Sequence, residues 1–219
     1  MSLNLPPGML TQPMIEESGA INNLAELIAH SEELGRTFRS RDIWWRGENA
    51  NGWRLVPSTY RDGRDWNWEH SACTFFRLKA GTRYQKCPPH NGFAAWLFLM
   101  QHYRLPTRLL DWTESSLVAA FFAVEGVPEP QRDGVVWALN PLALNQRQIG
   151  LPRYLAPGHR LAAPLFLPAF IDAPQQARTV AIVPNEIDTR MLIQQSVFTI
   201  HGNTTPLEDL PDANVFLRK

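Results

Sequence analysis

One stretch of the sequence, QHYRLPTRLLDWT at residues 101–113, places polar chemistry where the chain should be building its core. It lies between two of the most apolar segments of the chain, and four of its side chains are charged or titratable: His102, Arg104, Arg108 and Asp111. Burying such groups costs stability unless they are paired or bind a ligand. The stretch is therefore either a structural clamp or part of a ligand site.

Pro106 fixes the local structure of this stretch, because the residue before a proline disfavours the helical conformation. We therefore expect a helix over 93–103 that ends before it. Asp111 and Glu114 have the spacing of a capping box and predict another helix over 111–123. That helix should be buried on most sides, since its sequence is apolar all round.

Two interpretations of the stretch stay open. In the structural one, Asp111 caps the following helix and pairs with Arg108, while His102 bonds a backbone carbonyl. In the functional one, Asp111 still acts locally, but Arg108 and His102 face a pocket that they share with Arg46. Residue spacing alone favours the structural interpretation.

The rest of the pattern predicts one α+β domain with helices early in the chain and a mixed or antiparallel sheet late. Further helices are expected over 22–34, 69–80 and 185–195, and strands over 43–45, 135–139, 165–171, 179–183 and 197–201. Residues 1–20 carry three prolines without periodicity and indicate a flexible arm ahead of a single domain over 21–219.

Composition excludes several classes of protein. Lys plus Arg and Asp plus Glu balance at 21 each, so no overall field draws the chain to nucleic acid or to a membrane. No apolar run approaches the roughly 18–20 residues that span a bilayer, and the N-terminus lacks signal-peptide features, so we expect a cytoplasmic protein. Cys73 and Cys87 have neither disulfide-scaffold nor zinc spacing.

The charge is uneven locally. Residues 36–83 hold ten Lys and Arg against five Asp and Glu, a net charge of +5, together with five of the eight tryptophans. A basic, aromatic-rich section suits an anionic ligand with flat rings, such as a nucleotide. Core tryptophans with solvated arginines explain the same composition equally well.

Two shorter motifs add candidate ligand residues. Trp45-Arg46-Gly47 ends a predicted strand with a guanidinium that suits phosphate or carboxylate and a glycine that lets a ligand approach the backbone. Arg190 and Gln194 are four residues apart and share one face of a helix. Read alone, each motif also fits an ordinary turn or an exposed polar stripe.

Motifs of several common enzyme classes are absent from the sequence. The sequence has no GxGxxG after a strand, no Walker loop, no HExxH and no GxSxG. No metal site and no resident cofactor are therefore predicted.

Taken together, three blocks resemble the FRG domain, a bacterial family named for an aromatic-Arg-Gly motif. They are WRGE at 45–48 followed by LVPSTYR, QHYRLPTRLLDWT followed by SSLVAAFFA, and a weaker block formed by Arg190, Gln194 and Phe198. The likeness covers roughly residues 22–202. Arg104 and Ser196 stand where the family usually has glycine.

The aromatic-Arg-Gly motif is also similar to the first-strand motif of arginine-class ADP-ribosyltransferases, whose arginine helps to hold NAD. The fold that this likeness implies is an ADP-ribosyltransferase-like form of the α+β class. The Ser-Thr-Ser and Glu-x-Glu elements that such enzymes often carry are not found. A toxin or phage-defence setting is compatible with the family, although no residue indicates it.

The resemblance implies a nucleotide-binding enzyme that cleaves NAD or transfers its ADP-ribose, with NAD as substrate. Asp111 or Glu48 would stabilise the sugar cation, and His102 would position a hydroxyl or transfer a proton. The expected ligand-binding residues are Trp45, Arg46, Gly47, Thr107, Arg108, Arg190 and Gln194. The alternative is a non-catalytic module that binds a nucleotide, RNA or protein partner, with no membrane role in either case.

Overall fold

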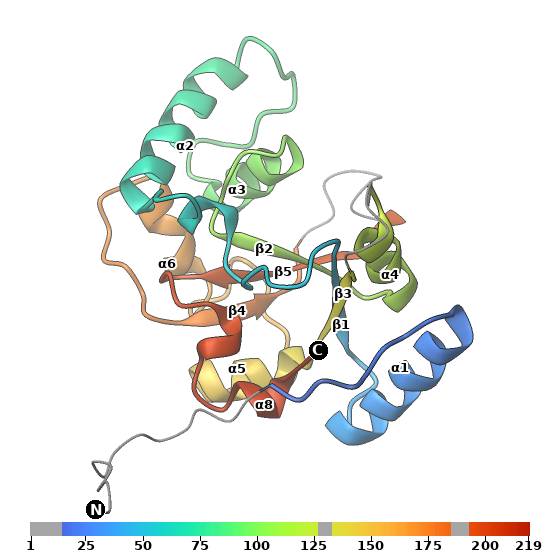
Figure 1. Cartoon of the computed structure of the whole chain (residues 1–219). Coiled ribbons are helices and arrows are strands. Elements are labelled where there is room, and N and C mark those ends of the chain that lie inside the picture. The colour runs from blue at the N-terminus through green and yellow to red at the C-terminus, as the bar shows by residue number, and fades with distance from the viewer. Residues whose placement is uncertain (1–14, 127–132, 185–192) are drawn as a thin grey trace, which may run out of the picture.

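The centre of the molecule is a curled antiparallel sheet (Figure 1). The structure is a computed structural model, and it describes residues 15–126, 133–184 and 193–219. The strands follow the order β4-β5-β2-β1-β3-β6. Their bounds are β1 Trp44–Glu48, β2 Leu109–Thr113, β3 Val135–Leu139, β4 Thr179–Ile182, β5 Ser196–His201 and β6 Leu217–Arg218.

The sheet consists of two well-paired halves that meet at a weak seam. β1 pairs with β3 from Trp44 to Glu48, and β2 pairs with β5 along its whole length. The two central strands, β1 and β2, are joined by one residue pair only, Trp45 with Thr113. Beyond that pair the strands separate, and the backbone N–H and C=O groups along the facing edges of β1 and β2 are not paired with each other.

Different helices cover the two halves (Figure 1). The β4-β5-β2 half packs against α2, Trp66–Ala80, α3, Phe93–His102, and α6, Ala163–Phe166, around a core that includes Met100 and Phe198. The β1-β3 half packs against α1, Leu24–Phe38, and α4, Ser116–Val124. The opposite face of the sheet carries α5, Pro141–Ile149, and α8, Ala213–Phe216.

The predicted α+β class is confirmed, as are most of the elements. Asn23 caps α1 by accepting a hydrogen bond from the backbone of Glu26, and β3 has the bounds that the pattern predicted. The sheet is not confined to the late chain, since of its two central strands β1 lies in the first quarter and β2 at the middle of the sequence. α5 was not predicted, although Asn140 caps it and Pro141 opens it in the usual way.

Two predicted elements are wrong. Leu165–Ile171 is not a strand, because α6 and a 3-10 turn at Leu167–Ala169 occupy most of it. The helix predicted over 111–123 begins only at Ser116, with Ser115 as its cap, because the preceding residues extend as β2 against β5. The helix predicted over 185–195 lies almost wholly outside the described residues.

The first described residues lie against the chain's last residue. Within the predicted arm, Ser18 donates its backbone N–H to Lys219 at 2.7 Å, and Lys219 donates back to Glu16 at 3.2 Å. Residues 1–14 are outside the described part of the chain. In that part no helix is long and apolar enough to cross a bilayer.

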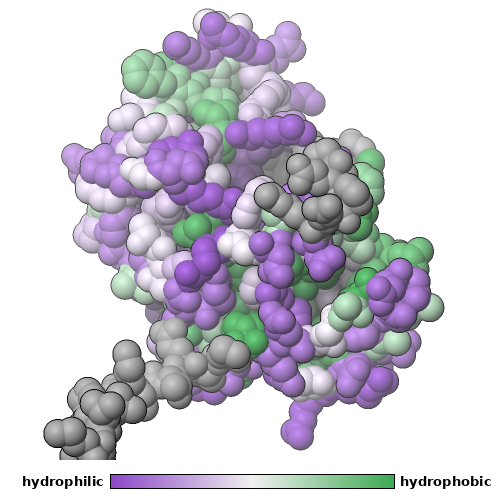
Figure 2. All heavy atoms as spheres, in the orientation of Figure 1, coloured by the Kyte–Doolittle hydropathy of each residue, from purple (hydrophilic) through white to green (hydrophobic). Residues whose placement is uncertain are grey.

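The surface seen in Figure 2 is largely hydrophilic, with hydrophobic side chains gathered over the end of α2 and around α4. The exposed aliphatic and phenylalanine residues of those helices are Phe75, Leu78, Leu117, Phe121 and Val124. None of them faces the seam between β1 and β2, where a pocket opens instead.

Candidate functional site

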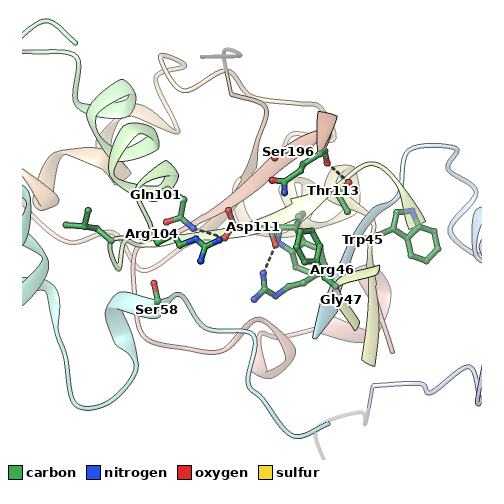
Figure 3. Close-up of a pocket in the computed structure, with 13 residues that line it drawn as sticks. Trp45, Arg46, Gly47, Ser58, Gln101, Arg104, Asp111, Thr113 and Ser196 are labelled. Atoms are coloured by element: carbon green, nitrogen blue, oxygen red, sulfur yellow. Dashed lines mark hydrogen bonds between the residues drawn. The ribbon is translucent and has the colours of Figure 1, made fainter. Parts of the chain in front are cut away.

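A pocket of about 360 Å³ opens at the seam between β1 and β2 (Figure 3). Its lining comes from β1, β2, the ends of α3 and β5, and one residue of α4. Three charged side chains line it, Arg46, Arg104 and Asp111, together with the polar residues Ser58, Gln101, Thr113, Gln194 and Ser196. The pocket thus exists where the sheet's own pairing is weakest.

Arg46 bridges the seam. Its Nη1 donates to the backbone carbonyl oxygen of Asp111 at 2.8 Å, and its Nε donates to Glu48 Oε1 at 3.1 Å. A guanidinium has five N–H groups, and these contacts use two of them. The side chain of Arg46 is 17% exposed, and the residue lines the pocket.

Asp111 presents its carboxylate to the pocket from the middle of β2. Its Oδ2 accepts a hydrogen bond of 2.6 Å from the Gln101 amide at the end of α3. The same Gln101 side chain accepts from the hydroxyl of Thr107, which is buried and also accepts from the backbone of Leu109. The hydrogen bonds from Thr107 to Gln101 and from Gln101 to Asp111 fix the position of the carboxylate.

The start of β5 closes one side of the pocket. Thr113 donates its hydroxyl to the carbonyl of Gln194 at 2.7 Å, and Ser196 pairs with Thr113 in the sheet. Gln194, one of the predicted ligand-binding residues, lines the pocket. Its predicted companion Arg190 lies outside the described residues.

Arg108 is buried on the α2 side of the sheet and does not line the pocket. Its Nε donates to Glu69 Oε2 at 2.8 Å, its backbone N–H donates to Glu69 Oε1 at 2.7 Å, and its Nη1 donates to the carbonyl of Leu165 at 3.1 Å. Both members of this ion pair have fully buried side chains. The predicted pair between Arg108 and Asp111 is thus replaced by a pair with Glu69, because Asp111 alternates to the pocket side of β2.

Two other predicted catalytic groups lie away from the cavity. Glu48 is only 3% exposed and is not part of the pocket lining; its carboxylate holds Arg46. His102 is the last residue of α3, where its ring packs edge-on against Tyr103 with 5.2 Å between the ring centres. Asp111 is therefore the predicted acid that reaches the pocket.

Gly47 serves helix packing. A Cβ at this position would lie 1.8 Å from the backbone oxygen of Ala119 and 2.7 Å from the backbone nitrogen of Ala123, both in α4. The aromatic-Arg-Gly motif therefore seats α4 on β1. Trp45 has a similar function, since it is buried with Ala119 and Ala138, and it also contributes to the pocket wall.

The surroundings of Arg46 are electropositive. Burial, and then the nearby charge of Arg46, lower the pKa of Arg61 below its usual value. Burial and the same charge lower the pKa of His201 to about 3. Over the described ranges, His, Cys, Asp and Glu side chains form no group of three or more that could hold a metal ion.

Sequence reasoning missed several of these residues. Gln101 opens the quoted stretch, and its place in the last turn of the helix that ends before Pro106 was the available signal. Ser58 reaches the pocket from the short 3-10 helix Ser58–Tyr60, and Glu69 pairs with Arg108 from 39 positions earlier in the chain. No spacing rule connects residues that far apart.

The family model of the FRG domain matches residues 41–132. That range contains Arg46, Gln101, Arg104, Asp111 and the Glu69–Arg108 pair, and it ends before Gln194 and Ser196. It is narrower than the likeness seen in the sequence, whose weaker third block falls outside it. Searches of curated proteins and of solved structures found no significant match.

Proposed function

Since the chain contains an FRG domain, we propose that the seam pocket of this domain binds a nucleotide, with NAD as the foremost candidate. One observation carries the proposal: Arg46 from β1 and the fixed carboxylate of Asp111 from β2 face one cavity where the sheet separates. The cavity volume of about 360 Å³ lies within the range of small-molecule sites.

The two ends of a nucleotide suit the two charges of the pocket. Guanidinium groups bind phosphate through paired N–H donors, so Arg46 is the expected partner of the diphosphate. Asp111, held by Gln101, suits the hydroxyls of a ribose, which donate hydrogen bonds to a carboxylate. The wall contributed by Phe122 supplies apolar surface for a ring.

The same carboxylate supports cleavage of NAD or transfer of ADP-ribose. The bond between C1′ of the nicotinamide ribose and the ring nitrogen breaks, and neutral nicotinamide leaves with the electron pair. In cleavage the oxygen of water forms the new bond to C1′, and in transfer an oxygen or nitrogen of the acceptor does so. The attacking group releases its proton to Asp111 or to solvent. A fixed carboxylate beside the sugar stabilises the positive charge that develops on it.

A second candidate function, a non-catalytic binding module, is favoured by a separate surface. The guanidinium of Arg61 lies over the ring of Trp53, and that of Arg64 lies over the ring of Trp68. Both tryptophans are exposed. Alternating aromatic rings and cations form the stacking surface that single-stranded nucleic acids use.

Calorimetric titration with ADP-ribose and NAD tests the first function. Arg46→Ala should weaken binding at least tenfold, whereas Arg147→Ala, which removes a surface arginine paired with Asp212 and absent from the pocket lining, should leave it unchanged. Turnover would be established if the wild-type protein releases nicotinamide from NAD and the Asp111→Asn variant does not. Wild-type protein that binds neither ligand, yet binds single-stranded RNA through Trp53 and Trp68, would favour the second function.

A further inference from the structure

Arg104 has a backbone conformation that suits glycine. Its φ is +60°, in the left-handed region, directly after the last turn of α3. Its N–H bonds the carbonyl of Gln101 at 2.9 Å, and the N–H of Leu105 bonds that of Met100 at 3.0 Å. This pair of bonds defines a Schellman motif, and its left-handed position is usually glycine because a Cβ crowds the backbone there.

The protein itself does not compensate this strain through the side chain. Residue 104 is exposed, and its guanidinium makes no hydrogen bond or ion pair with the residues that the structure describes. The arginines near it behave differently: Arg46 bonds Glu48, Arg61 bonds the carbonyl of Val56, and Arg64 bonds Asp62. Backbone strain at a residue whose side chain does not stabilise the fold indicates that the side chain has a function.

The guanidinium of Arg104 lines the seam pocket. Figure 3 shows Arg104 and Arg46 beside Asp111, Arg104 from the end of α3 and Arg46 from β1. The carboxylate of Asp111 repels any anion placed next to it. Arg46 and Arg104, which lie beside that carboxylate, are therefore best matched by one anionic group each. Two phosphates joined by one bridging oxygen satisfy that arrangement, and a single phosphate satisfies only half of it.

We propose that Arg104 is a specificity-determining residue that binds the second phosphate of a diphosphate ligand in the seam pocket. The inference rests on the proposed function and deepens it, because it selects nucleoside diphosphates and their conjugates over monophosphates. Glycine at position 104 would relieve the backbone strain and remove this selection.

The chain offers a matched control for the test. Arg39 follows α1 with φ +48°, its N–H bonds the carbonyl of Arg36, and the N–H of Ser40 bonds that of Gly35. Arg39 therefore occupies the same position of the same motif, but it does not line the pocket. Replacing either arginine with glycine should raise the melting temperature, and only the change at 104 should affect ligand binding.

Calorimetric titration with ADP and AMP, together with thermal melting, tests the proposal. We expect wild-type protein to bind ADP more tightly than AMP. Arg104→Gly should lower the affinity for ADP at least tenfold and that for AMP less than twofold, with a raised melting temperature. Arg39→Gly should raise the melting temperature and leave both affinities unchanged.

Results other than these would overturn the Arg104 inference, the proposed function or both. Unchanged ADP affinity in Arg104→Gly, with binding still lost in Arg46→Ala, would overturn the Arg104 inference and leave the proposed function standing. Wild-type protein that binds none of ADP, AMP, NAD and ADP-ribose would overturn the proposed function, and the Arg104 inference with it. Wild-type protein that binds ADP and AMP equally tightly would overturn the Arg104 inference alone.

Discussion

Arg104 and Arg108 are four residues apart in one motif, and the structure treats them in opposite ways. Arg108 is fully buried, and Glu69 and the carbonyl of Leu165 receive its donors. Arg104 is exposed in the pocket, with a strained backbone and no ion pair to the described residues. The motif at residues 101–113 therefore contributes one arginine to the core and another to the lining of the pocket.

The division falls at Pro106. Before it, Gln101 and Arg104 end α3 and turn toward the pocket; after it, Arg108 enters the core and Asp111 returns to the pocket by strand alternation. Thr107 links the two sides, because it is buried and hydrogen-bonds Gln101. Changes on the core side should therefore affect stability, and changes on the pocket side should affect binding.

The largest loss of stability is expected from the core side. Arg108→Met leaves the carboxylate of Glu69 buried without its cation, which should lower the free energy of unfolding by about 3–5 kcal/mol. Urea denaturation followed by circular dichroism measures this. A loss below about 1 kcal/mol would mean that the buried pair does not stabilise the fold.

Gly47→Ala should have the next largest effect. The added methyl would meet the backbone of Ala119 at 1.8 Å, and moving α4 to relieve this overlap should cost about 1–3 kcal/mol or more. Gly81→Ala is the matched control, since a Cβ there meets nothing within 4 Å. Equal melting temperatures for the two variants would contradict the packing role of the motif.

His201 predicts the pH dependence of stability. Its pKa is lowered from 6.5 to about 3 in the folded protein, so below pH 6.5 only the unfolded chain takes up the proton. The free energy of unfolding should therefore decrease as the pH falls from 6.5 toward 3, by about 1.4 kcal/mol per pH unit from this group. His201→Gln should reduce that slope, and an unchanged slope would contradict the assignment.

Asp111→Asn should have the smallest effect on stability. The residue is exposed, and an asparagine can still accept the hydrogen bond from Gln101, so the free energy of unfolding should change by less than about 1 kcal/mol. Loss of NAD turnover without loss of folding is the expected result. A loss of about 3 kcal/mol, seen in the same denaturation assay, would instead place Asp111 in a structural clamp.

Local patterns predicted much of the fold. β3, β4 and β5 follow apolar runs, and the cap of α1 follows from Asn23. The start of the helix after Asp111 was wrong because the pairing of β2 with β5 outweighs a capping-box spacing, and that pairing joins residues far apart in the chain. For the same reason the sequence named Arg46, Asp111 and Gln194, which line one pocket, but not the partner of Arg108, which depends on how α2 packs.

A structure of the protein with ADP-ribose bound would show whether the seam pocket is the nucleotide site. We predict the diphosphate within hydrogen-bond distance of Arg46, in the seam between β1 and β2, with the ribose beside Asp111. The Glu69–Arg108 pair should be unchanged, since it belongs to the core. ADP-ribose bound at another place on the molecule, or a seam that stays empty at saturating ligand, would contradict the account.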